Sequence, residues 1–106
     1  MSLSTHVLDA VTGRPAAGVT VTLTDAAGTE LTTASADADG RIGQLGADLP
    51  AGLYRLHFDT GGYFAVQDIP TFYPEIVIAF EITDPAGKYH VPVLLSPYAY
   101  STYRGS

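Results

Sequence analysis

The stretch Val19-Thr20-Val21-Thr22-Leu23-Thr24 alternates apolar and polar residues without a break. A period of two residues is typical of a β-strand that buries one face, and β-branched threonine suits the pleated surface of a sheet. Leu53–Phe58 alternates in the same way, and the pattern predicts that Tyr54, Leu56 and Phe58 point inward. These two stretches therefore predict half-buried strands of an all-β protein.

Other segments of the chain have the same character. Five of them read as strands: Leu3–Asp9, Glu30–Ala34, Ile76–Ile82, Tyr89–Leu95 and Tyr98–Tyr103. Turn-forming residues separate the strands at Thr12–Pro15, Ala27–Gly28, Asp39–Gly40, Ala51–Gly52 and Asp84–Gly87. Short strands with turns at this spacing predict an antiparallel β-sandwich. One short helix is expected within Gly61–Ile69, because Pro70 ends it.

Pro92 is the exception within its predicted strand. Proline has no N–H to donate to a neighbouring strand, so it is rare in the interior of a sheet. The segment Tyr89–Leu95 is therefore expected to lie at the edge of a sheet, to carry a bulge or to border a cavity.

The composition limits the classes of protein to which the chain can belong. Its 106 residues fit one domain, residues 1–106, and a content of 46% hydrophobic and 15% charged residues excludes a disordered chain. So few charges on a small chain favour self-association. There is no cysteine, which excludes disulfides and thiolate metal sites.

The charge and hydropathy patterns exclude two kinds of partner. The net charge is −6 with only five lysines and arginines, and nucleic-acid binding needs clustered positive charge. No apolar run approaches the roughly 20 residues of a membrane span. Met1 and Ser2 do not begin a secretory signal. We therefore expect no nucleic-acid or membrane partner and a cytoplasmic location.

Two of the three histidines stand in otherwise apolar strands. Alternation places His6 on one face with Ser4 and Leu8, and it places His90 on one face with Pro92. Two imidazoles on neighbouring strands could activate a water molecule or bind a metal, because histidine titrates near neutral pH. A zinc site would need a third protein ligand, which is hard to find without cysteine.

The third histidine and one arginine are less distinctive. His57 lies between Arg55 and Asp59 on the polar face of its strand, where solvation explains it. The segment Asp37–Arg41 hints at a calcium loop, but it lacks the spacing of oxygen-bearing residues and the final glutamate of an EF-hand. A hairpin turn fits this segment better. Arg41 follows the turn, so its side chain either projects toward a site or is simply solvated.

Segments along the whole chain resemble the transthyretin superfamily, and within it the 5-hydroxyisourate hydrolases. The matching segments are His6–Asp9, Thr12–Ala16, Asp39–Arg41, Tyr73–Ile76, Tyr89–Pro92 and Leu94–Ser106. Leu94–Tyr98 is shared with transthyretin itself, whereas Tyr103-Arg104-Gly105-Ser106 resembles the terminus of the hydrolases. At the positions matching His6, Arg41 and His90, transthyretin has lysine, glutamate and threonine, and this chain has the residues of the hydrolases.

This resemblance implies a transthyretin-like antiparallel sandwich of about eight strands in two four-stranded sheets, with one short helix. It implies a homotetramer, a dimer of dimers, with its sites at the subunit interfaces. The implied activity is hydrolysis of 5-hydroxyisourate to 5-hydroxy-2-oxo-4-ureido-2,5-dihydro-1H-imidazole-5-carboxylate in urate degradation. Water would attack an amide of the ring, and no metal or other cofactor would take part.

The resemblance also implies roles for individual residues. Catalysis would depend on His6, Arg41 and His90. Substrate binding would involve His6, Arg41 and Tyr103, with support from the C-terminal residues Arg104, Gly105 and Ser106. The sequence leaves two alternatives open: a transthyretin-like carrier of a small aromatic ligand, and a plain β-sandwich interaction module.

Overall fold

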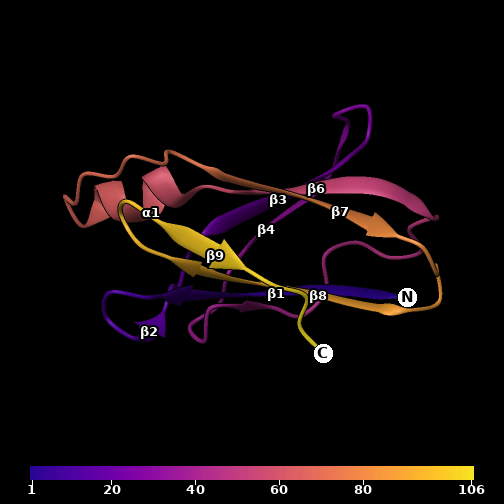
Figure 1. Cartoon of the computed structure of the whole chain (residues 1–106), viewed down its shortest axis with the longest axis horizontal. Coiled ribbons are helices and arrows are strands. Elements are labelled where there is room, and N and C mark those ends of the chain that lie inside the picture. Colours follow the sequence, from indigo (N-terminus) through magenta and orange to yellow (C-terminus); the bar gives the residue numbers. More distant parts are fainter.

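Two β-sheets pack face to face, and one short helix lies at one end of the sandwich (Figure 1). The computed structural model describes residues 1–106. The first sheet contains β1 (Ser2–Asp9), β2 (Arg14–Pro15), β5 (Arg41–Ile42), β8 (Lys88–Leu95) and β9 (Tyr100–Thr102). The second sheet contains β3 (Thr20–Asp25), β4 (Glu30–Ser35), β6 (Gly52–Phe58) and β7 (Ile76–Ile82). The helix α1 (Thr60–Val66) follows β6.

The strand order confirms the predicted sandwich. The first sheet has the order β2-β1-β8-β9, with β5 paired to β1, and the second sheet has the order β4-β3-β6-β7. A sandwich of two four-stranded sheets and one short helix was expected; the two sheets and the helix are present, and the short strand β5 adds a fifth strand to the first sheet. The sequence did not predict β2 and β5 as strands, because a segment of two residues is too short to show alternation.

The helix α1 begins close to its predicted position. The Asp59 side chain caps it, since its Oδ1 accepts a hydrogen bond of 3.0 Å from the backbone N–H of Gly62. Within the helix, Phe64 is buried in the core. No helix of the structure has the length and apolar character that crossing a membrane requires.

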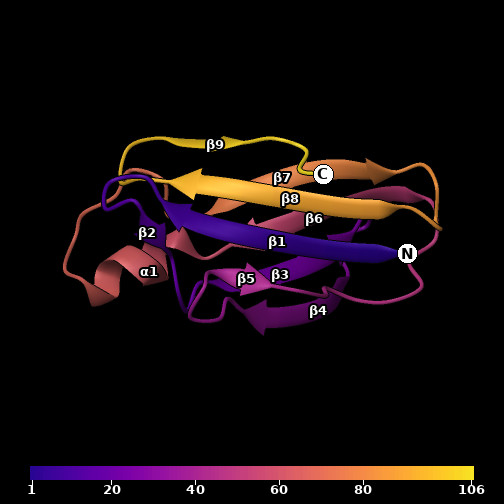
Figure 2. The same ribbon diagram turned by 90° about the horizontal axis from the view of Figure 1, so that it is seen from below.

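The strands β1 and β8 run parallel, which departs from the antiparallel expectation. Their register joins Ser2 to Lys88 at one end and Asp9 to Leu95 at the other, and Figure 2 shows the two strands side by side. The chain enters β8 from β7, in the other sheet, and so reaches the first sheet at the end where β1 also begins. Alternation within one strand gives no information on the direction of its neighbour.

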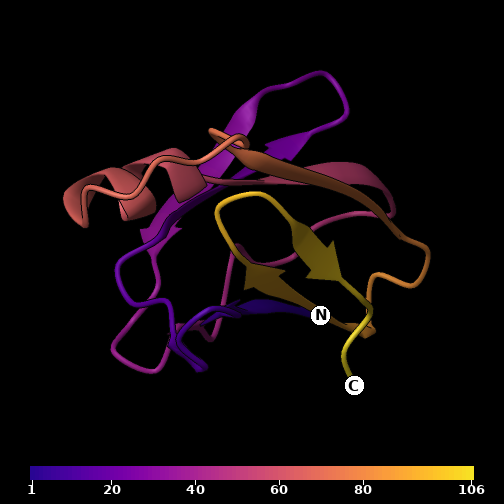
Figure 3. The same cartoon turned by 60° about the vertical axis from the view of Figure 1, so that its left-hand side comes forward.

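The core lies between the two sheets and follows the predicted alternation. Figure 3 shows the strand β1 below and the strands of the second sheet above. The side chains of Tyr54, Leu56 and Phe58 are buried, which confirms their predicted direction. They belong to one cluster of 20 buried hydrophobic residues. Burying one large apolar side chain contributes about 1.5–3 kcal/mol, so this cluster is the main stabilising feature of the fold.

Pro92 lies in β8, which has a neighbour on each side, so of the three predicted alternatives the edge strand is wrong. The alternative of a strand that borders a cavity is confirmed, because residues of β8 line two cavities. The pairing of β8 with β9 stops at Val93 and resumes only at an isolated bridge between His90 and Gly105. Within this gap the Pro92 carbonyl accepts a hydrogen bond of 2.8 Å from the Thr102 hydroxyl. The sheet tolerates the proline because its missing N–H falls where the ladder is interrupted.

A buried carboxylate joins the end of β1 to the helix. Asp9 is only 2% exposed. Its Oδ1 accepts hydrogen bonds from the backbone N–H groups of Val11 and Thr12, at 2.9 and 3.2 Å. Its Oδ2 accepts a bond of 2.9 Å from the Tyr63 hydroxyl. Burial, and then the hydrogen bond to Asp9, raises the pKa of Tyr63, so this hydroxyl stays protonated as a donor at neutral pH.

We predict that Tyr63→Phe lowers the free energy of unfolding by about 1.5–3 kcal/mol, because it removes a hydrogen bond to a buried carboxylate. Denaturant unfolding at fixed protein concentration measures the change. Tyr98→Phe is the matched control, since Tyr98 is 67% exposed and its hydroxyl should contribute less than about 0.5 kcal/mol. If Tyr63→Phe and the unsubstituted protein unfold at the same denaturant concentration, the hydrogen bond from Tyr63 to Asp9 does not stabilise the fold.

Candidate active site

Three residues that the sequence singled out lie on adjacent strands of the first sheet. His6 on β1 pairs with Arg41 on β5, and Ser4 on β1 pairs with His90 on β8. The two histidines point away from the core, since the buried residues of β1 and β8 alternate with them. We call His6, Arg41 and His90 the histidine–arginine site.

A tight turn fixes the position of Arg41. The Asp37 side chain accepts hydrogen bonds of 2.9 Å from the backbone N–H groups of Asp39 and Arg41. Gly40 has a φ of 73°, and a Cβ at this position would collide with the carbonyl oxygen of Val7. The segment is therefore a turn, as predicted, and the Asp37 carboxylate is engaged by the backbone of its own loop.

The ring of His6 is held by the same turn. Its Nε2 lies 3.0 Å from the carbonyl oxygen of Asp39. A carbonyl can only accept a hydrogen bond, so Nε2 must carry the proton. In neutral His6 the other nitrogen, Nδ1, is then unprotonated and able to accept a proton.

The ring of His90 is more enclosed. Its Nδ1 lies 2.8 Å from the hydroxyl oxygen of Ser4. Burial lowers the pKa of His90, the positive charge of Arg41 lowers it further, and His6 does so when it is protonated, while a contact with Ser4 acts in the opposite direction. His90 is therefore neutral at neutral pH. The effects of these charges follow from the closeness of the three side chains.

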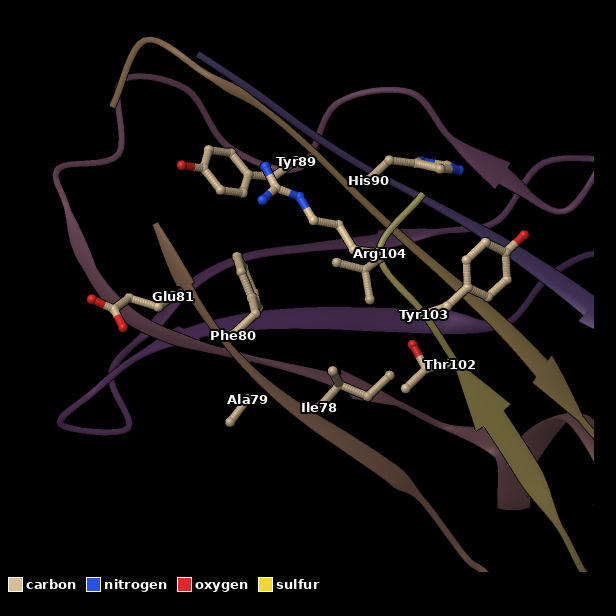
Figure 4. A pocket seen from close by; sticks show the side chains of 10 residues that line it. Ile78, Ala79, Phe80, Glu81, Tyr89, His90, Thr102, Tyr103 and Arg104 are labelled. Carbon is tan, nitrogen blue, oxygen red and sulfur yellow. The ribbon is translucent and has the colours of Figure 1, made fainter. Parts of the chain in front are cut away.

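Two cavities meet at His90. One, of about 540 Å³, is lined by polar groups that include Ser4, Arg41 and His90. The other, of about 320 Å³, lies between β7 and the C-terminal segment and is lined by His90 and Tyr103 (Figure 4). His6 lines neither cavity, although it pairs with Arg41.

The C-terminal residues that the sequence singled out lie against β8. The N–H of Gly105 donates a hydrogen bond of 2.9 Å to the carbonyl of His90. A Cβ on Gly105 would collide with the His90 ring and would lie 3.1 Å from Pro92 Cγ, so only glycine fits there. Tyr103 is 59% exposed and lines the second cavity. Ser106 lines the first cavity.

Arg104 is held by groups that the sequence analysis did not identify. Its guanidinium carbon lies 4.9 Å from the ring centroid of Tyr89, and its Nη2 donates a hydrogen bond of 3.3 Å to the carbonyl of Lys88. Figure 4 shows the guanidinium beside the Tyr89 ring. The Tyr89 hydroxyl contacts the backbone of Thr83 and Asp84. These contacts, with the bond to Asp84 first, lower the pKa of Tyr89.

Ser4 and Tyr89 are the residues near the site that sequence reasoning missed. Alternation places Ser4 on the same face as His6, which was the one available signal. Its contact with His90 depends on the register of two strands that are far apart in the chain. The structure brings no group of three or more His, Asp or Glu side chains together in a way that could hold a metal ion.

Comparisons with known proteins identify relatives of the whole chain. A family model described as HIUase/Transthyretin family matches residues 3–105. A 5-hydroxyisourate hydrolase of Salmonella typhimurium is 50% identical over 109 residues, which cover 98% of this chain and 80% of that protein.

Solved structures have the same fold. The 5-hydroxyisourate hydrolase of Klebsiella pneumoniae superposes with a TM-score of 0.93 at 43% identity, over 100% of both chains. Sea bream transthyretin in complex with thyroxine gives a TM-score of 0.90 at 34% identity, over 99% of this chain and 95% of that one. The fold is thus that of the transthyretin-like β-sandwiches. The chain belongs to the HIUase/Transthyretin family.

We predict that Tyr89→Leu loosens the C-terminal segment, because it removes the aromatic face beneath Arg104. Such a contact contributes roughly 0.5–1 kcal/mol at an exposed site, so hydrogen exchange at the Gly105 amide should accelerate by about two- to fivefold. Tyr89→Phe is the matched control, since it keeps the ring and removes only the hydroxyl. Equal acceleration in both variants would show that the hydroxyl, and not the ring face, holds the segment.

Proposed function

We propose that this chain is a 5-hydroxyisourate hydrolase of urate degradation and that the histidine–arginine site carries the reaction. The observation that carries the proposal is the pairing of β5, β1 and β8, which gathers Arg41, His6 and His90 on the outer face of one sheet. Two relatives that match nearly the whole of this chain, those of Salmonella typhimurium and Klebsiella pneumoniae, are 5-hydroxyisourate hydrolases. The substrate is then 5-hydroxyisourate, and the product is the ureido-imidazoline carboxylate.

Hydrolysis of a ring amide needs three things: an activated water, stabilisation of the negative charge on the carbonyl oxygen, and a proton for the departing nitrogen. In our proposal, His6 and His90 share the work of base and acid. His6 offers its unprotonated Nδ1, because its Nε2 proton is committed to Asp39. His90 is neutral at neutral pH and can exchange a proton with the substrate.

Arg41 supplies the positive charge in this proposal. Its side chain is exposed, and it lines the cavity that also contains His90. A guanidinium stays charged at any pH of interest and can bind two substrate oxygens at once. The charge stabilises the tetrahedral intermediate more than the planar amide, because negative charge develops on oxygen only in the former.

The C-terminal segment completes the proposed site. Tyr103 offers a hydroxyl and a flat ring face to the substrate from the second cavity. Arg104, Gly105 and Ser106 support it: Gly105 bonds to the backbone of His90, and Arg104 stacks on Tyr89. No cofactor is needed for the steps described.

We further propose that the protein is a homotetramer, a dimer of dimers, with its sites at the subunit interfaces. Exposed aromatic side chains support this: Phe72, Tyr98 and Tyr103 are each more than half exposed. Exposed apolar surface of this kind is typical of protein interfaces. We also propose a single domain over residues 1–106 and a cytoplasmic location, with no nucleic-acid or membrane partner.

The transthyretin-like carrier is the second candidate, because sea bream transthyretin, solved with thyroxine, has the same fold. One assay separates the two functions. 5-Hydroxyisourate is generated with urate oxidase, and the decay of its absorbance is followed with and without this protein. A decay rate that rises in proportion to added protein supports the hydrolase. An unchanged decay rate would exclude the hydrolase and favour the carrier.

We predict that His6→Ala and His90→Ala each reduce kcat by about 10²–10⁴-fold, the range expected when an acid or base is lost. The absorbance assay measures this change. His57→Ala is the control, since His57 lies on β6 in the other sheet, and it should keep full activity. Light scattering should give the same mass for all variants. Full activity of either site variant would remove that histidine from the chemistry.

We predict that Arg41→Glu lowers kcat/KM by at least about 100-fold, because it replaces the charge that stabilises the oxyanion with one that opposes it. Arg14→Glu makes the same change of charge on an exposed residue of β2, outside both cavities. This control should stay within about twofold of the unsubstituted protein. If both variants lose activity equally, the overall charge matters and Arg41 has no specific role.

A further inference from the structure

One hydroxyl beside the histidine–arginine site has no role in the proposed reaction. Ser4 lies on β1 directly opposite His90, and its Oγ is 2.8 Å from Nδ1 of the imidazole. Building on the proposed function, we propose that Ser4 is a positioning residue. Its hydroxyl binds Nδ1, fixes the orientation of the His90 ring, and leaves Nε2 as the nitrogen that faces the substrate.

The His90 ring needs such a partner because imidazole is nearly symmetric in shape. The torsion about the bond between Cβ and the ring is broad and roughly twofold, so a free ring can turn over and exchange its two faces. Turning the ring over exchanges Nδ1 with Cδ2 and Nε2 with Cε1, which moves both nitrogens away from their partners. An acid or base works only if the correct nitrogen, in the correct state, reaches the substrate.

Ser4 is the only group of the chain that forms a hydrogen bond with the His90 ring. Gly105 bonds to the backbone carbonyl of His90 and therefore fixes the strand without fixing the ring. The ring of His6 is bound to the carbonyl of Asp39. Each of the two histidines thus has one nitrogen bound to the protein and one nitrogen left for a ligand.

The position of Ser4 follows from the geometry of β1. Ser4 and His6 are two residues apart, so they lie on the same face of the strand. Both are half-buried, and Ser4 lines the cavity that also contains Arg41 and His90. One face of β1 therefore supplies His6 and also supplies Ser4, which binds the ring of His90.

A matched pair of variants tests the role of the hydroxyl. Ser4→Thr keeps the hydroxyl, and Ser4→Val has nearly the same shape without it. Both are β-branched residues that suit a strand. We expect kcat to fall about tenfold in Ser4→Val, the usual effect of losing one hydrogen bond, with KM within about twofold. Ser4→Thr should stay within about threefold of the unsubstituted protein, and Ser4→Ala should behave like Ser4→Val.

Nitrogen-15 NMR of the histidine side chains gives a readout that a merely structural role would not change. The Nδ1 shift of His90 should be that of a hydrogen-bonded nitrogen in the unsubstituted protein and in Ser4→Thr. In Ser4→Val it should move toward the value of a nitrogen that lacks this hydrogen bond. Ser35→Ala, which removes an exposed serine of β4 in the other sheet, should change neither kcat nor these shifts.

Three results would overturn the proposal. The first is unchanged His90 shifts in Ser4→Val. The second is a kcat of Ser4→Val equal to that of Ser4→Thr. The third is a change in KM with kcat unaffected, which would make Ser4 a substrate-binding group. The NMR experiment needs no turnover, so a failure of the hydrolase assignment and a failure of the Ser4 assignment are distinguishable.

Discussion

The parallel pairing of β1 with β8 is the constraint on which the site depends. Eight consecutive residue pairs join the two strands in one register. A slip of one residue would turn every outward side chain toward the core, since successive residues of a strand face opposite sides. The buried Thr5 hydroxyl helps to hold the register by donating a hydrogen bond of 2.7 Å to the carbonyl of Val91. The meeting of His6 with His90 is thus secured by residues on the opposite face of the strands.

The sequence predicted the elements of this fold better than it predicted their pairing. Alternation located the long strands and the inward face of Leu53–Phe58, and it assigned His6 and His90 each to one face of its strand, because burial imposes a period of two on each strand separately. It could not predict the parallel direction of β8, nor the position of Pro92 inside a sheet. Those features depend on how segments some 85 residues apart come together, and no local pattern encodes them.

The same division holds within the site. Resemblance to a family pointed to His6, Arg41 and His90. The residue pattern alone did not decide whether the Arg41 side chain projects toward a site or is simply solvated. The contacts of Ser4 and Tyr89 arise only from strand register, and a hydroxyl or a ring looks the same in a sequence whether or not it touches a functional group. The turn at Asp37 was predicted only in part. Its glycine and aspartates predicted a turn, but not the hydrogen bond between its Asp39 carbonyl and the His6 ring.

The outward direction of the histidine–arginine site has a consequence for the divergence of this fold. His6, Arg41 and His90 lie outside the buried cluster, so replacing them leaves the packing between the sheets intact. If the proposed reaction depends on these positions, a lineage can exchange that reaction for ligand binding there without first acquiring compensating changes in its interior. That the superposition scores of the Klebsiella pneumoniae hydrolase and sea bream transthyretin on this chain are nearly equal, 0.93 and 0.90, fits such a history.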